Sequence, residues 1–395
     1  MKTLKSLMIF LAMLWFAPSN ANTDDAEAGI TAEITFTRTS KNIWRVAYKF
    51  SAPVSAIDLG PAVANYRTEA WTVLSPNVQL VSDHDNERLV IEGAAVTEIV
   101  LEAHRYTVMP EANYMPFAWF SDNGASMYLG HFMGDVETTD GLQTPQYDFI
   151  LQGRSNENTL MPLREGNEPV FAYFGPQVPV VTDSIVLIAD PGLPTWLRDM
   201  VDEIVPVLAS TYASALQIQL PSKPVVMIAA GDIDIFSQAK HMKGGALKRQ
   251  FNLAFAGLPP KRDEKEDLQK LIAHEMAHVW QRPEGINDFG VPWVYEGGAD
   301  AMAVAALQQA GIWTGEQVRA FSKDAAARCE KDLGGMDLDE AEANNNWAAA
   351  YSCGYAMYAQ TGMDVLTLWA LMVRHPDAAK TGYTPEILSA SLPIH

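Results

Sequence analysis

The chain has 395 residues, 48% of them hydrophobic and 10% aromatic, which excludes a disordered chain and supplies one large core or two to three ordinary ones. Its 28 basic and 48 acidic side chains give a formal net charge of −20. Such a surface repels phosphate backbones and anionic lipid, so no nucleic-acid or membrane-surface partner is expected. Solubility outside the cytoplasm explains the acidity better than substrate recognition does.

The first 21 residues are typical of a secretory signal. Lys2 and Lys5 precede an apolar run from Leu7 to Ala17, and small residues up to Ala21 offer a cleavage point. A retained membrane anchor is the alternative, but a spanning helix needs about 20 apolar residues and this run is shorter. The sequence therefore predicts a signal peptide that is removed, no stable membrane insertion afterwards, and a periplasmic or secreted protein.

Residues 22–180 are predicted to form an antiparallel β-sandwich. Between Ala32 and Phe132 the apolar positions follow a period of two, as in Trp44–Phe50, and turn signals separate the segments. Short strands at this spacing are typical of a sandwich of about 150 residues. Further strands are predicted at 88–92, 98–102 and 126–130.

The pattern changes in residues 181–395. Two apolar strands are predicted at 185–189 and 225–229, and a segment with helical spacing, 193–216, separates them. After Asp263 the sequence is helical almost throughout. The predicted helices begin near Glu264 and at Pro292 and then cover 316–333, 347–360, 365–373 and 385–391. The fold class is therefore α+β and multidomain, with a mostly helical C-terminal part.

The segment His274-Glu275-Met276-Ala277-His278 carries the main chemical signal. Residues four apart lie on one face of a helix, so both imidazoles can reach a single cation. Glu275 points about 100° aside, where it can act on the metal's water without being a ligand. The alternative is a surface helix with two solvated histidines.

A catalytic zinc takes three protein ligands and keeps one position for water, so a third ligand is required. Glu296 lies near the beginning of the next predicted helix and is placed for that role. Asp300, one turn later, faces the same way and can accept a hydrogen bond from the outer nitrogen of His274. The alternatives are an exposed acidic helix start for Glu296 and a surface carboxylate for Asp300.

These residues resemble the gluzincin class of metallopeptidases, in particular the M1 aminopeptidases and their M61-related relatives. Both share His-Glu-x-x-His with 274–278 and a later ligand segment with Trp293–Ala299. Seventeen residues, 279–295, separate the second histidine from Glu296, close to the M1 spacing. The resemblance covers about 244–362. It implies a thermolysin-like zinc peptidase domain that binds Zn²⁺ and acts on a peptide or protein substrate.

A second match lies further along the chain. Tyr351-Ser-Cys-Gly354 resembles the Tyr-x-x-Gly segment of M1 enzymes, whose tyrosine donates its hydroxyl to the oxyanion of the tetrahedral intermediate. The resemblance makes Tyr351 a second catalytic candidate beside Glu275. The alternative is core packing in a helix that also carries Tyr355 and Tyr358.

One part of the M1 pattern is missing. M1 exopeptidases carry a Gly-x-Met-Glu-Asn strand whose glutamate binds the free amine of the substrate, but here 244–249 reads Gly-Gly-Ala-Leu-Lys-Arg. Lys248 would repel an ammonium, and a desolvated cation without a partner is costly. We expect internal or blocked peptides to be cleaved better than single aminoacyl reporters, unless another acid, from the β-sandwich or at Asp232 or Asp234, reaches the site. The strand 251–255 is expected to line an extended peptide.

The interpretation that follows is zinc-dependent peptide-bond hydrolysis with Glu275 as the general base. One alternative is a zinc hydrolase of a non-peptide substrate, which the same residues would serve. The other is a non-catalytic peptide-binding protein with a relict peptidase domain, which predicts a disrupted Glu275 or a missing ligand. The oligomeric state is left open.

Only two cysteines occur in the chain, Cys329 and Cys353. In an oxidising compartment a lone pair is expected to be bridged, here by a disulfide that links two C-terminal helices.

Overall fold

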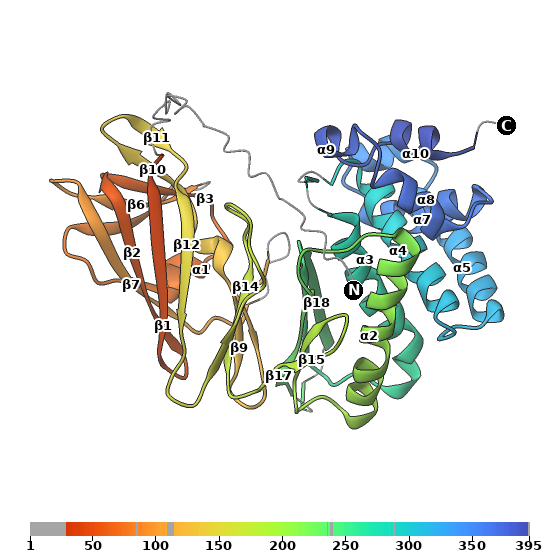
Figure 1. Cartoon of the computed structure of the whole chain (residues 1–395), viewed down its shortest axis with the longest axis horizontal. Helices are drawn as coiled ribbons and strands as arrows, with labels where there is room; N and C mark the ends of the chain where they lie inside the picture. Colours follow the sequence, from red (N-terminus) through yellow and green to blue (C-terminus); the bar gives the residue numbers. More distant parts are fainter. Residues whose placement is uncertain are drawn as a thin grey trace, which may run out of the picture.

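The computed structural model describes residues 29–393 except 84–85, 109–113, 235, 238–239, 284 and 287–288. The predicted signal peptide lies outside these residues. The described chain is an α+β protein with a β-rich half and a helical half (Figure 1). Within it, no helix combines the length and the apolar character that a membrane crossing requires.

Two five-stranded sheets form the N-terminal half and share one hydrophobic cluster. Their strands alternate between buried and more exposed side chains: in β1 every second residue, from Ala32 to Phe36, is buried. The prediction of purely antiparallel strands is wrong for one pair, because β1 and β12 run parallel. In spatial order the strands are β12 (Gln146–Gln152), β1 (Thr31–Ser40), β2 (Ile43–Val54), β7 (Val96–His104) and β4 (Trp71–Val73), then β11 (Gly141–Gln143), β10 (Asp135–Thr138), β3 (Ala56–Pro61), β6 (Asn86–Ile91) and β5 (Val78–Asp83).

A smaller antiparallel sheet lies beside the helical half. It consists of β13 (Asn158–Leu160), β14 (Phe171–Gly175), β9 (Ala125–Tyr128) and β8 (Phe117–Trp119). Phe120 and Tyr173 from this region share a hydrophobic cluster with Val225 and Met227 of the next sheet. The β-rich half is therefore packed directly onto the sheet that borders the site.

That sheet has the order β15 (Val180–Val181), β16 (Val186–Ala189), β17 (Val225–Ile233), β19 (Gln250–Gly257) and β18 (Lys240–Leu247). The strands predicted at 185–189, 225–229 and 251–255 are confirmed as β16, β17 and β19. The strand β18 was not predicted, since its glycines and lysines lack the apolar pattern of a buried strand. The expectation that 251–255 lines a peptide is wrong, because β19 lies inside the sheet and β18 occupies its edge.

Ten α-helices occur in the described residues, and the long ones lie where the sequence predicts them. Pro292 begins α4 at its first position, as expected for a residue without a backbone donor. The short helices α1, α6 and α9 were not predicted. The bounds are α1 (Tyr66–Ala70), α2 (Thr195–Leu216), α3 (Lys265–Gln281), α4 (Pro292–Gln309), α5 (Gly315–Leu333), α6 (Leu338–Ala343), α7 (Trp347–Gln360), α8 (Val365–Met372), α9 (Ala378–Thr381) and α10 (Pro385–Ser391).

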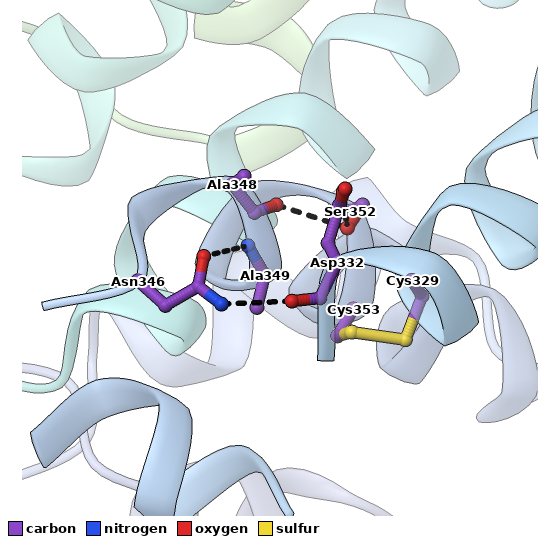
Figure 2. The surroundings of a disulfide bond; sticks show 7 residues. All are labelled: Cys329, Asp332, Asn346, Ala348, Ala349, Ser352 and Cys353. Carbon is purple, nitrogen blue, oxygen red and sulfur yellow. Dashed lines mark hydrogen bonds between the residues drawn. A yellow bond between two sulfur atoms is a disulfide. The ribbon is translucent and has the colours of Figure 1, made fainter. Parts of the chain in front are cut away.

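The predicted disulfide is confirmed. Cys329 of α5 is bonded to Cys353 of α7, and the two cysteines are 24 residues apart in the chain (Figure 2). Beside it, Ser352 donates a hydrogen bond to the side chain of Asp332 over 2.8 Å, and the side-chain amide of Asn346 donates to the Asp332 carbonyl oxygen. These contacts fasten α7 to α5.

Candidate metal centre

The two histidines lie on α3, whose opposite face is built into the core. The hydroxyl of Tyr212 on α2 donates to the carbonyl oxygen of Ala273 over 2.8 Å and fixes the position of α3. His274 and His278 are each only 5% exposed. Two solvated histidines on a surface helix are therefore excluded.

Glu296 completes a triangle of donor atoms. The Nε2 atoms of His274 and His278 are 3.0 Å apart, and Oε2 of Glu296 lies 3.2 Å from each of them. Donors about 2.1 Å from a tetrahedral zinc lie roughly 3.4 Å from one another. Two imidazoles and one carboxylate at these distances fit a zinc ion and leave a fourth position open.

Asp300 orients the first histidine. Its Oδ1 atom lies 2.6 Å from Nδ1 of His274, so the second imidazole nitrogen faces the triangle. The ammonium of Lys270 lies 2.5 Å from the same oxygen. Burial raises the pKa of Asp300, but His274 and then Lys270 lower it below its ordinary value. Burial lowers the pKa of His274, but Asp300 and Glu296 raise it to about 9. The surroundings therefore favour positive charge at the position of the triangle.

Gln281 orients the second histidine, His278, in the same way. Its Oε1 atom accepts from Nδ1 of His278 at 2.7 Å, and its Nε2 donates to the carbonyl oxygen of Tyr295 at 3.0 Å. Tyr383 donates its hydroxyl to the Gln281 carbonyl oxygen. Both imidazoles are thus held by a partner on the side away from the triangle, as is usual for metal-bound histidines.

Glu275 lies outside the triangle and faces the same cleft. Its carboxylate rests against the backbone of β18 at Gly244, where a β-carbon would come within 2.1 Å of Oε1 of Glu275. A side chain at this position would push the carboxylate away from where it now lies. Burial raises the pKa of Glu275, while His274 and His278 lower it.

Tyr351 reaches the site from α7. Its ring centre lies 5.6 Å from that of His274, and its side chain lines the cleft. Burial, and then the carboxylates of Glu296 and Glu275, raise the pKa of Tyr351, so the phenol keeps its proton and can donate it in a hydrogen bond. Simple core packing is therefore excluded for Tyr351.

Two glycines explain how α7 comes so close to α4. A β-carbon on Gly297 would lie 2.3 Å from the Cα of Gly354, and one on Gly354 would lie 2.2 Å from the carbonyl oxygen of Trp293. The helices therefore cross backbone to backbone, immediately beside Glu296 and three residues from Tyr351. Any side chain at the crossing would move these two groups apart.

The cleft in front of the triangle has a volume of about 640 Å³. Of the described residues that line it, the only carboxylates are Glu275 and Glu296. Its lining residues are Tyr114, Lys243, Gly244, Gly245, Ala246, His274, Glu275, His278, Phe289, Gly290, Pro292, Tyr295, Glu296, Trp347 and Tyr351.

Other residues that the sequence placed near the substrate lie elsewhere. Lys248 pairs with Glu168 at 3.1 Å and borders a neighbouring hollow, so the repulsion of an amine expected from it does not arise. Asp232 pairs with Arg105 at 2.7 Å, and neither it nor Asp234 lines the cleft.

Sequence reasoning missed several residues of the site. Gln281 follows His278 by three positions on one helix, and that spacing is a usable signal. Lys270 precedes His274 by one turn and offers the same signal. Tyr114 and Trp347 have no such signal, because they come from segments that only the fold brings to the cleft.

No protein-family model and no curated protein matches the sequence. The structure is similar to the aminopeptidase N family protein from Idiomarina loihiensis, with a TM-score of 0.62 and 11% identity over 91% of this chain and 72% of that chain. Weaker similarity extends to the M1 zinc metallopeptidase from Deinococcus radiodurans (TM-score 0.46, 13% identity, 93% of this chain and 92% of that one). The structure is also weakly similar to the leukotriene A4 hydrolase from Saccharomyces cerevisiae (TM-score 0.47, 10% identity, 91% of this chain and 64% of that one).

The chain therefore has the fold of the aminopeptidase N family protein. This agrees with the resemblance to M1-like gluzincins that the sequence motifs indicate.

Proposed function

We propose that this chain is an exported zinc metallopeptidase of the M1-like gluzincin type. In this proposal residues 22–180 form a β-sandwich domain and residues 181–395 a thermolysin-like catalytic domain. One hydrophobic cluster draws its members from Ile30–Phe174 and another from Ile185–Leu388, which supports this division. The disulfide supports export, since such bonds persist in oxidising compartments.

The observation that carries the proposal is the donor triangle of His274, His278 and Glu296, with Glu275 beside it in an open cleft. These three residues would hold the metal, and Asp300 would orient the first histidine. When bound, zinc supplies Lewis acidity toward water and the scissile carbonyl. A structural zinc site would be closed by a fourth protein ligand, whereas here the fourth side faces the cleft.

Each side chain around the triangle then has its own role in hydrolysis. Glu275 accepts a proton from the attacking water and delivers it to the leaving amine. The Tyr351 hydroxyl donates a hydrogen bond to the oxyanion that forms on the carbonyl oxygen. Asp300 and Gln281 keep the imidazoles in the tautomer that directs Nε2 toward the triangle.

The proposal is tested by zinc content and peptide cleavage measured on the same purified sample. We expect one zinc per chain, loss of zinc in His278→Ala, and retained zinc with lost activity in Glu275→Gln. The two variants separate metal binding from proton transfer. Equal zinc content in the wild type and in His278→Ala would show that the triangle does not bind the metal.

Cleavage of a peptide mixture identifies the reaction. Products with a new amino and a new carboxyl terminus, formed only by the zinc-loaded protein, are the expected result. A zinc-loaded protein that hydrolyses no peptide in the mixture would contradict the peptidase assignment.

A further inference from the structure

The first half of α7 carries two residues of the cleft but has little core of its own. Trp347 and Tyr351 line the cleft and lie on the first two turns of the helix. Before Gly354, the only side chain of α7 that belongs to the large core of the helical half is that of Ala350. Burial of one methyl group contributes little free energy, so other contacts fix this half of the helix.

Those contacts come from the C-terminal end of α5 (Figure 2). Cys329 forms the disulfide with Cys353 of α7. The side chain of Asp332 accepts from the hydroxyl of Ser352 over 2.8 Å, and its carbonyl oxygen accepts from the side-chain amide of Asn346 over 2.8 Å. The three contacts lie on α7 before and after the tyrosine of the cleft, so α5 determines where this part of α7 lies.

The apolar contact between the same segments is small. Its buried members among the described residues are Ala341, Ala349 and Cys353, and Cys329, Leu333 and Leu338 are partly buried against them. Two alanines and one cysteine bury little apolar area. A covalent bond between the helices is therefore the strongest link in this cluster.

The second half of α7 is fastened to α4 instead. Gly354 lies against the backbone of α4, and Tyr358 donates to the carbonyl oxygen of Val294 over 3.0 Å. The rings of Tyr355 and Tyr358 belong to the large core. Loss of the disulfide therefore leaves the second half of the helix in place and loosens the first half, which carries Tyr351.

Cys329 is the accessible partner of the bond, since it is half-buried and Cys353 is buried. The bond forms by exchange with an external disulfide. The thiolate of Cys329 attacks that disulfide and releases one thiol, and Cys353 then displaces the second thiol from the mixed disulfide. Two electrons and two protons pass from the cysteines to the external disulfide. In the reverse direction the helices are pressed apart, because non-bonded sulfur atoms stay at van der Waals distance.

We propose that the disulfide is a redox switch for the metal centre, which holds Tyr351 in place when Cys329 and Cys353 are bonded and releases it when they are reduced. This rests on the proposed function, in which Tyr351 donates to the oxyanion. The two cysteines are positioning residues, since neither lines the cleft. The chain is then weakly active in a reducing compartment and gains activity when a disulfide of an oxidising compartment accepts its electrons.

The test compares kcat and KM of the oxidised and the reduced wild type, with zinc quantified in both. We expect kcat to fall about 10- to 100-fold on reduction, because a displacement of about 1 Å in a catalytic group can cost that much. KM should stay within about twofold, because the bound substrate carries no oxyanion. Zinc should be retained, since its proposed ligands lie on α3 and α4.

A variant that combines Cys329→Ser with Cys353→Ser should show the same low kcat without reductant. Addition of reductant should leave this variant unchanged, which controls for effects of the reductant on the metal. Ser322→Ala is the matched control for the contact between α5 and α7. The hydroxyls of Ser322 and Tyr355 lie 2.7 Å apart, in the second half of α7, so this variant should keep wild-type kcat.

A double-mutant cycle shows whether the effect passes through the tyrosine. In Tyr351→Phe, which lacks the hydroxyl, reduction should lower kcat by less than about twofold further. A reduced wild type with unchanged kcat would overturn the proposal. An equal loss with and without the Tyr351 hydroxyl would overturn it too, because the bond would then act through stability alone.

Hydrogen exchange measures the positioning without a substrate. On reduction, the amides of 349–353 should exchange faster by about tenfold or more, and those of 355–360 should keep their rates. Equal rates at 349–353 in both forms would contradict the switch, whatever the activity. Absence of hydrolysis by the oxidised, zinc-loaded wild type would instead refute the proposed function, so the two failures are distinguishable.

Discussion

Gly354→Ala tests whether the close crossing of α4 and α7 controls activity. The new β-carbon would lie 2.2 Å from the carbonyl oxygen of Trp293, and contacts under 3.0 Å are essentially never seen. The helices must therefore separate by about 0.8 Å at this point. Tyr351 lies on α7 and Glu296 on α4, so the separation displaces the phenol from the metal centre.

The expected effect falls on catalysis more than on stability. A displacement of about 1 Å in a catalytic group can cost roughly 100-fold in rate, so we expect kcat/KM to fall by about that factor. Overpacking costs about 1–3 kcal/mol, but alanine gains about 1 kcal/mol over glycine within a helix, which offsets part of this loss. Zinc should be retained, because its proposed ligands lie on α3 and α4 and none lies on α7.

The assay measures kcat/KM, zinc content and thermal midpoint for Gly354→Ala and for a matched variant, Gly315→Ala. A β-carbon on Gly315, the first residue of α5, would meet its nearest neighbour, Arg319, only at 3.4 Å. The control should keep wild-type activity. If Gly354→Ala also keeps kcat/KM within twofold of the wild type, the argument that Tyr351 acts through this helix crossing is refuted.

The remaining predictions concern the disulfide and the partners of the histidines. Unfolded, never-reduced protein should contain no titratable thiol, and serine at both Cys329 and Cys353 should lower the free energy of unfolding by about 3 kcal/mol in denaturant titration; two free thiols would contradict this. Gln281→Ala should weaken zinc binding about 10- to 100-fold in competition with a chelator, because His278 loses the acceptor that orients it. Asp300→Asn should have a smaller effect of the same sign, and unchanged affinity in both variants would contradict the orienting role.

Much of the fold was predictable because the spacing of apolar residues along the chain agrees with the residues that are buried in the structure. The period-two alternation of β1 and β2 and the helical spacing of α2 are the same patterns that the core requires. The edge strand β18 was not predictable in this way. Its residues face a cleft on one side, so glycine and lysine are tolerated where a buried strand needs apolar side chains.

The chemistry of the site was determined by the sequence itself. His274 and His278 share a helix face at any tertiary arrangement, and the spacing from Glu296 to Asp300 keeps both acids on one side of α4. The tertiary structure alone decided what surrounds them. Tyr114 reaches β18 from 132 residues away in the chain, because the small sheet packs onto the sheet of the site. Local patterns encode which side chains lie together on one element, whereas contacts between distant elements depend on how whole surfaces pack.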